Sequence, residues 1–215
     1  MTDPTTHSQP AVDPALVARV KGILLQPKSE WLKIDGEFAT TKSLFTRYAM
    51  ILAAIGPVCS LLGGQLMPIM GMKLSIVGAI VVALVSYGMS LLGVFLLGLI
   101  INALAPNFGG TANKVQAMKL AVYSWTAAWL AGVFGLIPML GILAILGLYS
   151  FYLLFVGLPI LMKVPEDKKV GYFIVTVIAG VVMYFIISAI VGAISMSFVA
   201  ASVGMAGLAG MGAGY

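Results

Sequence analysis

The sequence predicts an all-α integral membrane protein with five transmembrane helices, preceded by an amphipathic arm on the cytoplasmic side. Of its 215 residues, 61% are hydrophobic and only 9% are charged, where a soluble domain has roughly 25% charged residues. The mean hydropathy is +1.09, and the apolar residues form long runs without any charge. A water-soluble globule of this size could not bury so much apolar surface, so the composition excludes one.

The first forty residues predict a tail and an arm. Residues 1–12 are polar and contain proline, which predicts disorder. The arm, residues 13–40, has two short amphipathic segments separated by Pro27. Basic residues beside an apolar stripe and a tryptophan are typical of a helix on an anionic membrane surface. The predicted contacts to that surface or to a partner are Arg19, Lys21, Lys28 and Trp31. Packing of the same apolar stripe against the end of the bundle is an equal alternative.

Charge-free runs define a membrane domain over residues 41–203. A bilayer core of roughly 30 Å needs about 20 apolar residues per helix. The segment GLIPMLG at 135–141 supplies a turn that divides one run of 43 uncharged residues into two spans. The predicted spans are 48–67, 75–104, 118–136, 140–162 and 171–200, followed by a glycine-rich tail at 204–215.

The distribution of basic residues predicts the orientation of these spans. Twelve Lys and Arg against seven Asp and Glu give a net charge of +5, and the basic residues lie between apolar runs. With a cytoplasmic N-terminus, all of them except Lys73 fall on the cytoplasmic side, as the positive-inside rule expects. We therefore expect an extracytoplasmic C-terminus and no nucleic-acid partner.

The predicted membrane interior is chemically bare. The chain has one histidine, one cysteine, and no acidic residue between Glu37 and Glu166. Ionisable groups within spans usually mark proton relays and ion sites, metal sites need clustered ligands, and nucleophiles need a nearby base. We expect no catalytic residue, no metal, no cofactor and no enzymatic activity.

Small and polar residues within the spans give two further predictions. Ser124, Ala128 and Gly132 recur every four residues and predict a helix-packing seam. Such a seam suits intramolecular packing and a homo-oligomer equally well. A second set of residues could line a path or groove for a small solute: Asn102, Tyr149, Tyr152 and Pro159.

Three motifs carry a family resemblance. LYSFY at 148–152, followed by GLP at 157–159 and MKVPEDKKVGY at 162–172, resembles the YIP family, the Ypt/Rab-GTPase-interacting membrane proteins. The arm segment RVKGILLQPKSEWLKIDGE at 19–37 is similar to that of the family's small bacterial branch. The resemblance covers about 15–200 and implies a five-span bundle in a bacterial inner membrane with a cytoplasmic N-terminus.

The activity of that family does not transfer directly. Its eukaryotic members act as adaptors in vesicle traffic, and the acidic–aromatic motif that precedes their first span is missing from SLFTRYAMILAAIGPV at 43–58. The predicted function is a non-enzymatic membrane scaffold or adaptor that binds partner proteins or the lipid surface through its cytoplasmic face. The alternative is a transporter or channel for a small neutral or hydrophobic solute.

Overall fold

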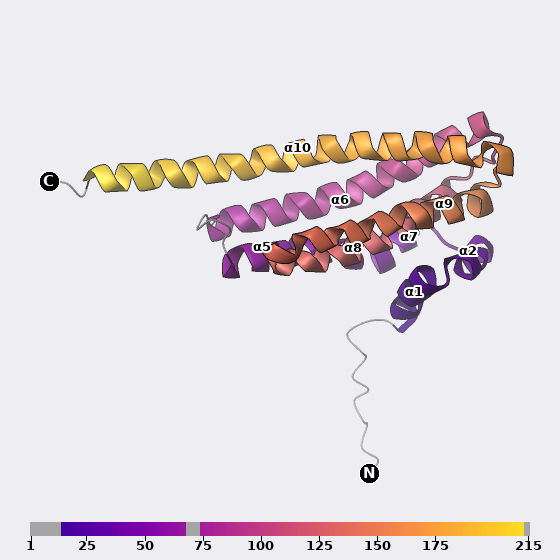
Figure 1. Ribbon diagram of the computed structural model, residues 1–215, viewed down its shortest axis with the longest axis horizontal. Coiled ribbons are helices and arrows are strands. Elements are labelled where there is room, and N and C mark those ends of the chain that lie inside the picture. Colours follow the sequence, from indigo (N-terminus) through magenta and orange to yellow (C-terminus); the bar gives the residue numbers. More distant parts are fainter. Residues whose placement is uncertain (1–13, 68–73, 213–215) are drawn as a thin grey trace, which may run out of the picture.

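The computed structural model describes the backbone of residues 14–67 and 74–212, and all regular secondary structure there is helical (Figure 1). The predicted disordered segment 1–12 lies outside the described residues. The arm forms α1 (Pro14–Leu25) and α2 (Pro27–Gly36). The next elements are α3 (Thr41–Leu44), the π-helical η1 (Phe45–Ala49), α4 (Met50–Ala53), α5 (Ile55–Leu66), α6 (Ile76–Leu104) and the 3₁₀ turn η2 (Ala105–Phe108). The chain ends with α7 (Lys114–Ser124), α8 (Thr126–Ala131), the 3₁₀ segments η3 (Gly132–Leu136) and η4 (Pro138–Leu148), α9 (Tyr149–Met162) and α10 (Glu166–Gly212).

Side-chain caps fix several helix starts. Thr40 and Ser43 form a reciprocal capping box ahead of α3. The hydroxyl of Ser75 accepts from the backbone N–H of Gly78 at the start of α6. The Asn113 carboxamide accepts from two backbone N–H groups in the first turn of α7. These polar residues therefore mark where the chain enters each helix.

The described residues contain four helical segments that are long and apolar enough to cross a membrane. They are Thr41–Leu66, Ile76–Phe108, Met139–Met162 and Glu166–Ala201, and they overlap four of the five predicted spans. The predicted third span, 118–136, is helical but breaks at Trp125, and its last five residues are 3₁₀. Its first turns also contain the buried Lys119. Because of these interruptions the segment does not form one long apolar helix, and the count of five spans is not confirmed.

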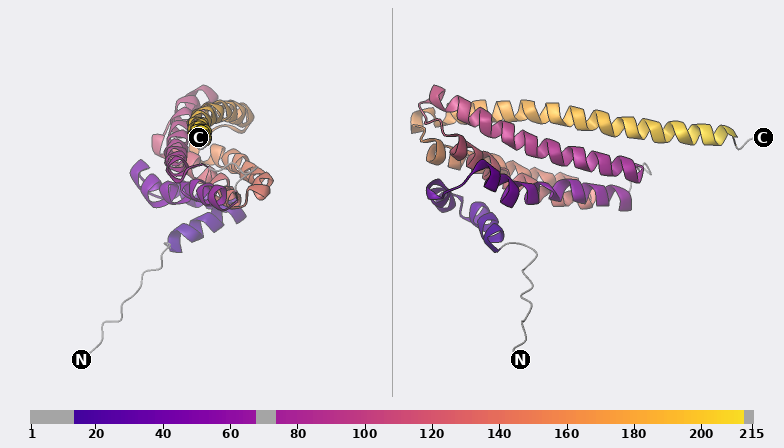
Figure 2. Two further views of the ribbon diagram at one scale, coloured as in Figure 1. Left: turned by 90° about the vertical axis from the view of Figure 1, so that its left-hand side faces the viewer. Right: turned by 180° about the vertical axis from the view of Figure 1, so that it is seen from behind.

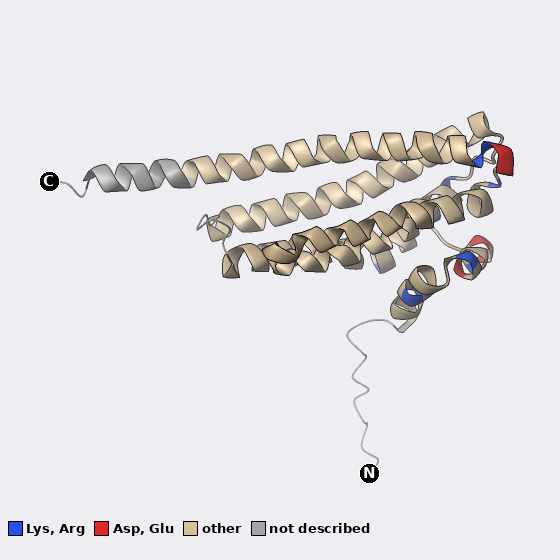
Figure 3. Cartoon of the chain, viewed as in Figure 1, with Lys and Arg blue, Asp and Glu red and all other residues tan. Residues whose placement is uncertain are grey.

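The helices run side by side as a bundle, with the arm outside it near one end (Figures 1 and 2). In the part of the chain that the structure describes, the charged residues gather toward this same end (Figure 3). We call it the charged end. Its core contains the fully buried side chains Trp31, Met118, Leu120, Leu153 and Leu158. Fully buried side chains therefore lie where the arm meets the bundle.

Helix α10 packs along α6 and then runs beyond the rest of the bundle (Figure 1). Its 47 residues correspond to about 70 Å at 1.5 Å per residue, more than twice the roughly 30 Å bilayer core. The helix continues to Gly212, so most of the segment predicted as a tail at 204–215 is helical.

Candidate functional site

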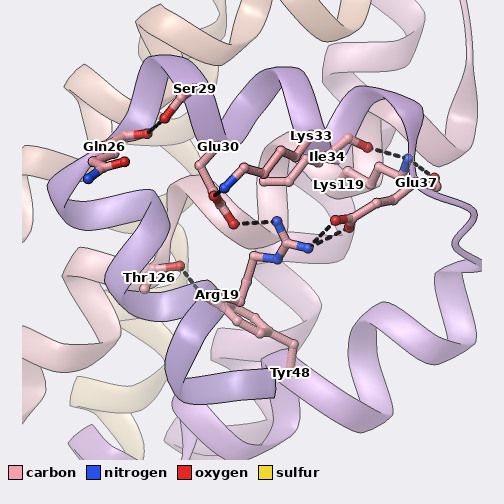
Figure 4. Close-up of polar contacts among 10 residues, drawn as sticks. All are labelled: Arg19, Gln26, Ser29, Glu30, Lys33, Ile34, Glu37, Tyr48, Lys119 and Thr126. Atoms are coloured by element: carbon pink, nitrogen blue, oxygen red, sulfur yellow. Dashed lines mark hydrogen bonds and ion pairs between the residues drawn. The ribbon is translucent and has the colours of Figure 1, made fainter. Parts of the chain in front are cut away.

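The two helices of the arm fold against each other around one arginine. The guanidinium of Arg19 donates to the carboxylate of Glu30 at 2.6 Å and, through both carboxylate oxygens, to Glu37 (Figure 4). Lys33 pairs with the second oxygen of Glu30 at 3.0 Å. A Cβ on Gly22 would lie 2.5 Å from the Glu30 carboxyl carbon, so glycine lets α1 approach this cluster. The arm is therefore a preformed helical hairpin with an internal ion-pair network.

Arg19 is held in its charged form by this network. Burial alone would lower its pKa, but the hydrogen bond to Glu37 and the negative charges of Glu37 and Glu30 raise the pKa overall. The guanidinium carbon also lies 5.6 Å from the ring centroid of Tyr123 on α7, in a cation–π arrangement. Only 18% of the Arg19 side chain is exposed, so it is occupied inside the arm.

Two side chains of α7 hold the C-terminal end of α2. The buried ammonium of Lys119 donates to the carbonyl oxygens of Ile34, at 2.7 Å, and Glu37, at 2.6 Å (Figure 4). The amide of Gln116 donates to the backbone and side-chain oxygens of Asp35, both at 3.0 Å. The last carbonyl groups of a helix lack hydrogen-bond donors within the helix. Here the side chains of α7 supply donors for carbonyl groups at the end of α2.

Helix α9 and Lys163, the residue that follows it, add two more polar contacts to the arm. The hydroxyl of Tyr149 donates to the carbonyl oxygen of Leu24 at 3.0 Å, which fixes the end of α1. Lys163 forms an ion pair with Asp35 of α2. We call the set of bundle residues that contact the arm the docking surface: Gln116, Lys119, Leu120, Tyr123, Tyr149, Gly157 and Lys163.

Trp31 is the apolar anchor of the arm. It is fully buried, and its ring meets Tyr123 edge-on at a centroid distance of 6.4 Å. A Cβ on Gly157 would lie 2.6 Å from the indole and 2.7 Å from a methyl group of Leu120. The indole therefore occupies the space that the missing side chain of Gly157 leaves. Behind this contact, the hydroxyl groups of Tyr48 and Thr126 share a buried hydrogen bond of 2.8 Å (Figure 4).

Of the four residues predicted as surface contacts, two are exposed and two are turned toward the protein. Lys21 and Lys28 are exposed, as a surface contact requires. Trp31 is not on the surface, because Gly157 and Tyr123 enclose it, and this corrects the expectation for that residue. Arg19 is likewise turned inward by its two carboxylate partners.

Sequence reasoning missed the apolar residues that the arm does expose. Leu25, Leu32 and Phe38 have exposed fractions of 77%, 65% and 96%. The lysines at 21, 28 and 33 of the arm are also exposed. Together these six residues make up what we call the outer face. Two of them lie at helix ends, since Leu25 is the last residue of α1 and Phe38 follows the C-cap of α2.

The residues predicted as a packing seam contact different neighbours. Gly132 lies against α5, where its Cβ would be 2.6 Å from the Cα of Gly56. The backbone N–H of Ala128 instead donates to the hydroxyl of Ser150 on α9, at 3.0 Å. Ser124 is buried. Gly132 thus contacts α5 and Ala128 contacts α9, so two positions of the same broken helix pack against different helices.

The residues predicted to line a path are divided between two helices. Asn102 is half-buried on α6. Tyr149 and Tyr152 lie together on α9, with ring centroids 5.2 Å apart, and Pro159 lies within the same helix. The hydroxyl of Tyr149 donates a hydrogen bond to the carbonyl oxygen of Leu24 in the arm. Among the residues that the structure describes, no group of three or more His, Cys, Asp or Glu is placed to hold a metal ion.

Comparison with known proteins covers both the arm and the bundle. A model of the Yip1 domain matches residues 21–190. The chain is 27% identical over 176 residues to the inner membrane protein YohC of Escherichia coli (strain K12). This alignment covers 78% of this chain and 90% of YohC. The values are the same for YohC of Escherichia coli O6:H1 (strain CFT073). No solved structure matches. The resemblance carried by the motifs is thereby confirmed: the chain is a membrane protein that belongs to the Yip1 domain family.

Proposed function

We propose that this protein is a non-enzymatic membrane scaffold that binds the lipid surface through the outer face of its arm. The observation that carries the proposal is the composition of that face, three exposed apolar side chains among three lysines, on an arm whose inner face is fixed to the bundle. A protein partner on the same face is the alternative that the experiments below distinguish.

The chemistry of the outer face matches an anionic bilayer interface. Each lysine near such a surface contributes about 1 kcal/mol of attraction, and exposed leucine and phenylalanine side chains gain by insertion among the acyl chains. The docked arm is also rigid, so little ordering entropy is lost on contact. A scaffold needs such a fixed surface.

The proposal includes the orientation of the bundle. We place the charged end in the cytoplasm, with 114–136 as a third crossing built from α7, α8 and η3. The gathering of the described charged residues at one end supports this placement (Figure 3). Five crossings would leave the N-terminus in the cytoplasm and the C-terminus outside it.

Cysteine labelling will decide the number of crossings. In a Cys59→Ser background, we expect Met139→Cys to react with a membrane-impermeant maleimide on intact spheroplasts, because residue 139 is 85% exposed and lies between the third and fourth crossings. Lys28→Cys and Lys168→Cys should react only after lysis. If 114–136 did not cross, Lys168→Cys would react on intact spheroplasts and Met139→Cys would not, which would contradict the five-span orientation.

Lipid contact of the outer face will be tested in the reconstituted full-length protein. An environment-sensitive dye at Leu32→Cys, in the Cys59→Ser background, should be quenched by lipids brominated near their headgroups. We expect stronger quenching in vesicles of phosphatidylcholine mixed with phosphatidylglycerol than in phosphatidylcholine alone. The double variant Lys21→Glu, Lys28→Glu should remove that difference, because it reverses two charges on the outer face.

The control is a dye at Thr111→Cys, an exposed residue near the charged end but outside the arm. Its quenching should be the same in both lipid mixtures. A dye at residue 32 that stays accessible to aqueous iodide and is not quenched in either mixture would contradict the lipid-binding function. Crosslinking of that face in cells to a protein, in place of lipid, would assign it to a partner.

A further inference from the structure

A groove lies in the part of the bundle away from the arm. Three cavities of about 730, 450 and 390 Å³ share Trp125 and Tyr184 in their walls, and the two larger ones also share Ser86 and Ser90. Because they have walls in common, we treat them as one groove, which we call the α6 groove. Each of the three cavities has a volume in the range of pockets that bind drug-sized molecules, roughly 300–1,000 Å³.

Residues of several helices, among them α5, α6, α8 and α10, form the walls of the α6 groove. Trp125 stands at the break between α7 and α8, so its side chain contributes to all three cavities. Tyr184 of α10 forms the opposite edge and is 61% exposed. The groove therefore opens along α10 toward the surroundings of the bundle, which in a membrane are lipid.

The lining has two kinds of chemistry. Hydroxyl groups come from Ser60 on α5, from Ser86 and Ser90 on α6, and from Tyr184. One of them is already engaged, since the indole N–H of Trp129 donates to the Ser90 hydroxyl at 3.0 Å. Ser188 adds a hydroxyl group to the second cavity, Ser150 adds one to the third, and Gln65 adds an amide to the first. The remaining wall is formed by aliphatic residues, glycines, Pro57 and the rings of Trp125, Trp129 and Phe151, and no residue that lines the three cavities is charged.

This combination defines the class of ligand. A purely hydrocarbon chain would leave the hydroxyl groups without partners in a region with no water. An anionic or cationic headgroup would find no counter-charge and would lose its hydration. A neutral molecule with a hydroxyl or ester head and a hydrocarbon chain satisfies both parts of the wall.

We propose that the α6 groove binds a neutral, hydroxyl-bearing lipid, with its head among the serine hydroxyl groups and its chain along α10. This site is distinct from the outer face of the arm, and it does not include the residues predicted for a path. Asn102, Tyr149, Tyr152 and Pro159 are absent from the walls of the three cavities. Entry is lateral, past Tyr184.

Photolabelling of the full-length protein in nanodiscs tests the proposal. The probe is a diacylglycerol with a photoreactive diazirine in one acyl chain and an alkyne for detection. We expect the labelled peptides to include the α6 segment with residues 86 and 90, or the α8 and α10 walls. Ser86→Leu should lower the labelling about tenfold, because it fills the groove and removes a hydroxyl that could meet the head of the lipid.

Matched controls separate the groove from ordinary boundary lipid. Ser197→Leu makes the same chemical change on α10 at an exposed residue outside the three cavities, and it should leave the labelling unchanged. Ser188→Leu repeats the groove filling from α10, because Ser188 lines the second cavity, so the test does not depend on one variant. Each variant is first compared with the parent chain for its thermal unfolding temperature. A phosphatidylglycerol probe with the same diazirine should compete poorly.

Two results would overturn the proposal. Labelling spread evenly over the exposed faces and unaffected by both groove-filling variants would mean that only boundary lipid is present. Disulfide crosslinks between Ser86→Cys and a cysteine on α10 of a second copy, in the Cys59→Ser background, would show that a neighbouring molecule fills the groove.

Discussion

Replacing Gly63 with alanine will strongly destabilise the bundle, whereas the same replacement at the neighbouring Gly64 will not. A Cβ on Gly63 would overlap the backbone carbonyl oxygen of Gly135 and lie 2.6 Å from that of Leu136. Neither oxygen belongs to a flexible side chain, so α5 and η3 would have to move apart. At Gly64 nothing lies within 4 Å of the added methyl group.

The expected difference is large because the two effects have opposite signs. Overpacking of a tight contact costs about 1–3 kcal/mol, and a shift of backbone against backbone extends along the whole α5–η3 interface. Alanine in place of glycine within a helix gains about 1 kcal/mol, so Gly64→Ala should be neutral or slightly stabilising. Thermal unfolding in detergent, followed by size-exclusion chromatography with fluorescence detection, measures both variants.

The predicted packing residue Gly132 gives an independent test of the same interface. Its Cβ would lie 2.6 Å from the Cα of Gly56, so Gly132→Leu should lower the unfolding temperature as Gly63→Ala does. Equal unfolding temperatures for the 63 and 64 variants would mean that α5 and η3 are not in close contact.

Removal of the Trp31 side chain will release the arm, whereas removal of the adjacent Leu32 side chain will leave it docked. Trp31 is fully buried between Gly157 and Tyr123, while Leu32 is 65% exposed. Truncation of a buried tryptophan to alanine costs about 3–5 kcal/mol. At about 1.4 kcal/mol per factor of ten, the amide hydrogens of α2 should exchange roughly two to four orders of magnitude faster in Trp31→Ala.

Hydrogen–deuterium exchange of the full-length protein in a neutral detergent measures this effect without lipid contact at Leu32. Peptides from α6 provide the internal reference and should keep their protection in both variants. If Trp31→Ala and Leu32→Ala exchange alike, the buried contact with Gly157 does not hold the arm, and the polar contacts from the docking surface would have to hold it.

The sequence predicted the long membrane helices well. The runs without charge placed a span at 75–104, and α6 occupies Ile76–Leu104. Such a helix is specified by local composition, because almost all of its residues are apolar. The third predicted span differs, since its buried Lys119 is hydrogen-bonded to carbonyl groups of the distant arm and its helix is interrupted at Trp125. Its hydropathy alone cannot show that the helix is interrupted.

The sequence predicted only in part which side chains of the arm face the bundle and which face outward. Tryptophan beside lysine and arginine is the composition of an interfacial helix and also of a helix anchored to a polar docking surface. Whether Trp31 faces the membrane surface or the bundle depends on Gly157, far along the chain, because this glycine leaves room for the indole. Two signals were available: a lysine at 119 within an apolar run, and acidic residues at 30 and 37 that could pair with Arg19. Both indicate partners inside the protein.

The distance along the chain between the arm and its docking surface has a consequence for biosynthesis. The contacts of the arm with α7 and α9 join residues 81 to 128 positions apart. At roughly 5–20 residues per second, a separation of 128 residues takes about 6 to 26 seconds to synthesise. The arm therefore leaves the ribosome long before Lys163 exists. During that interval its inner face, with Trp31, is uncovered next to the membrane into which the later helices insert.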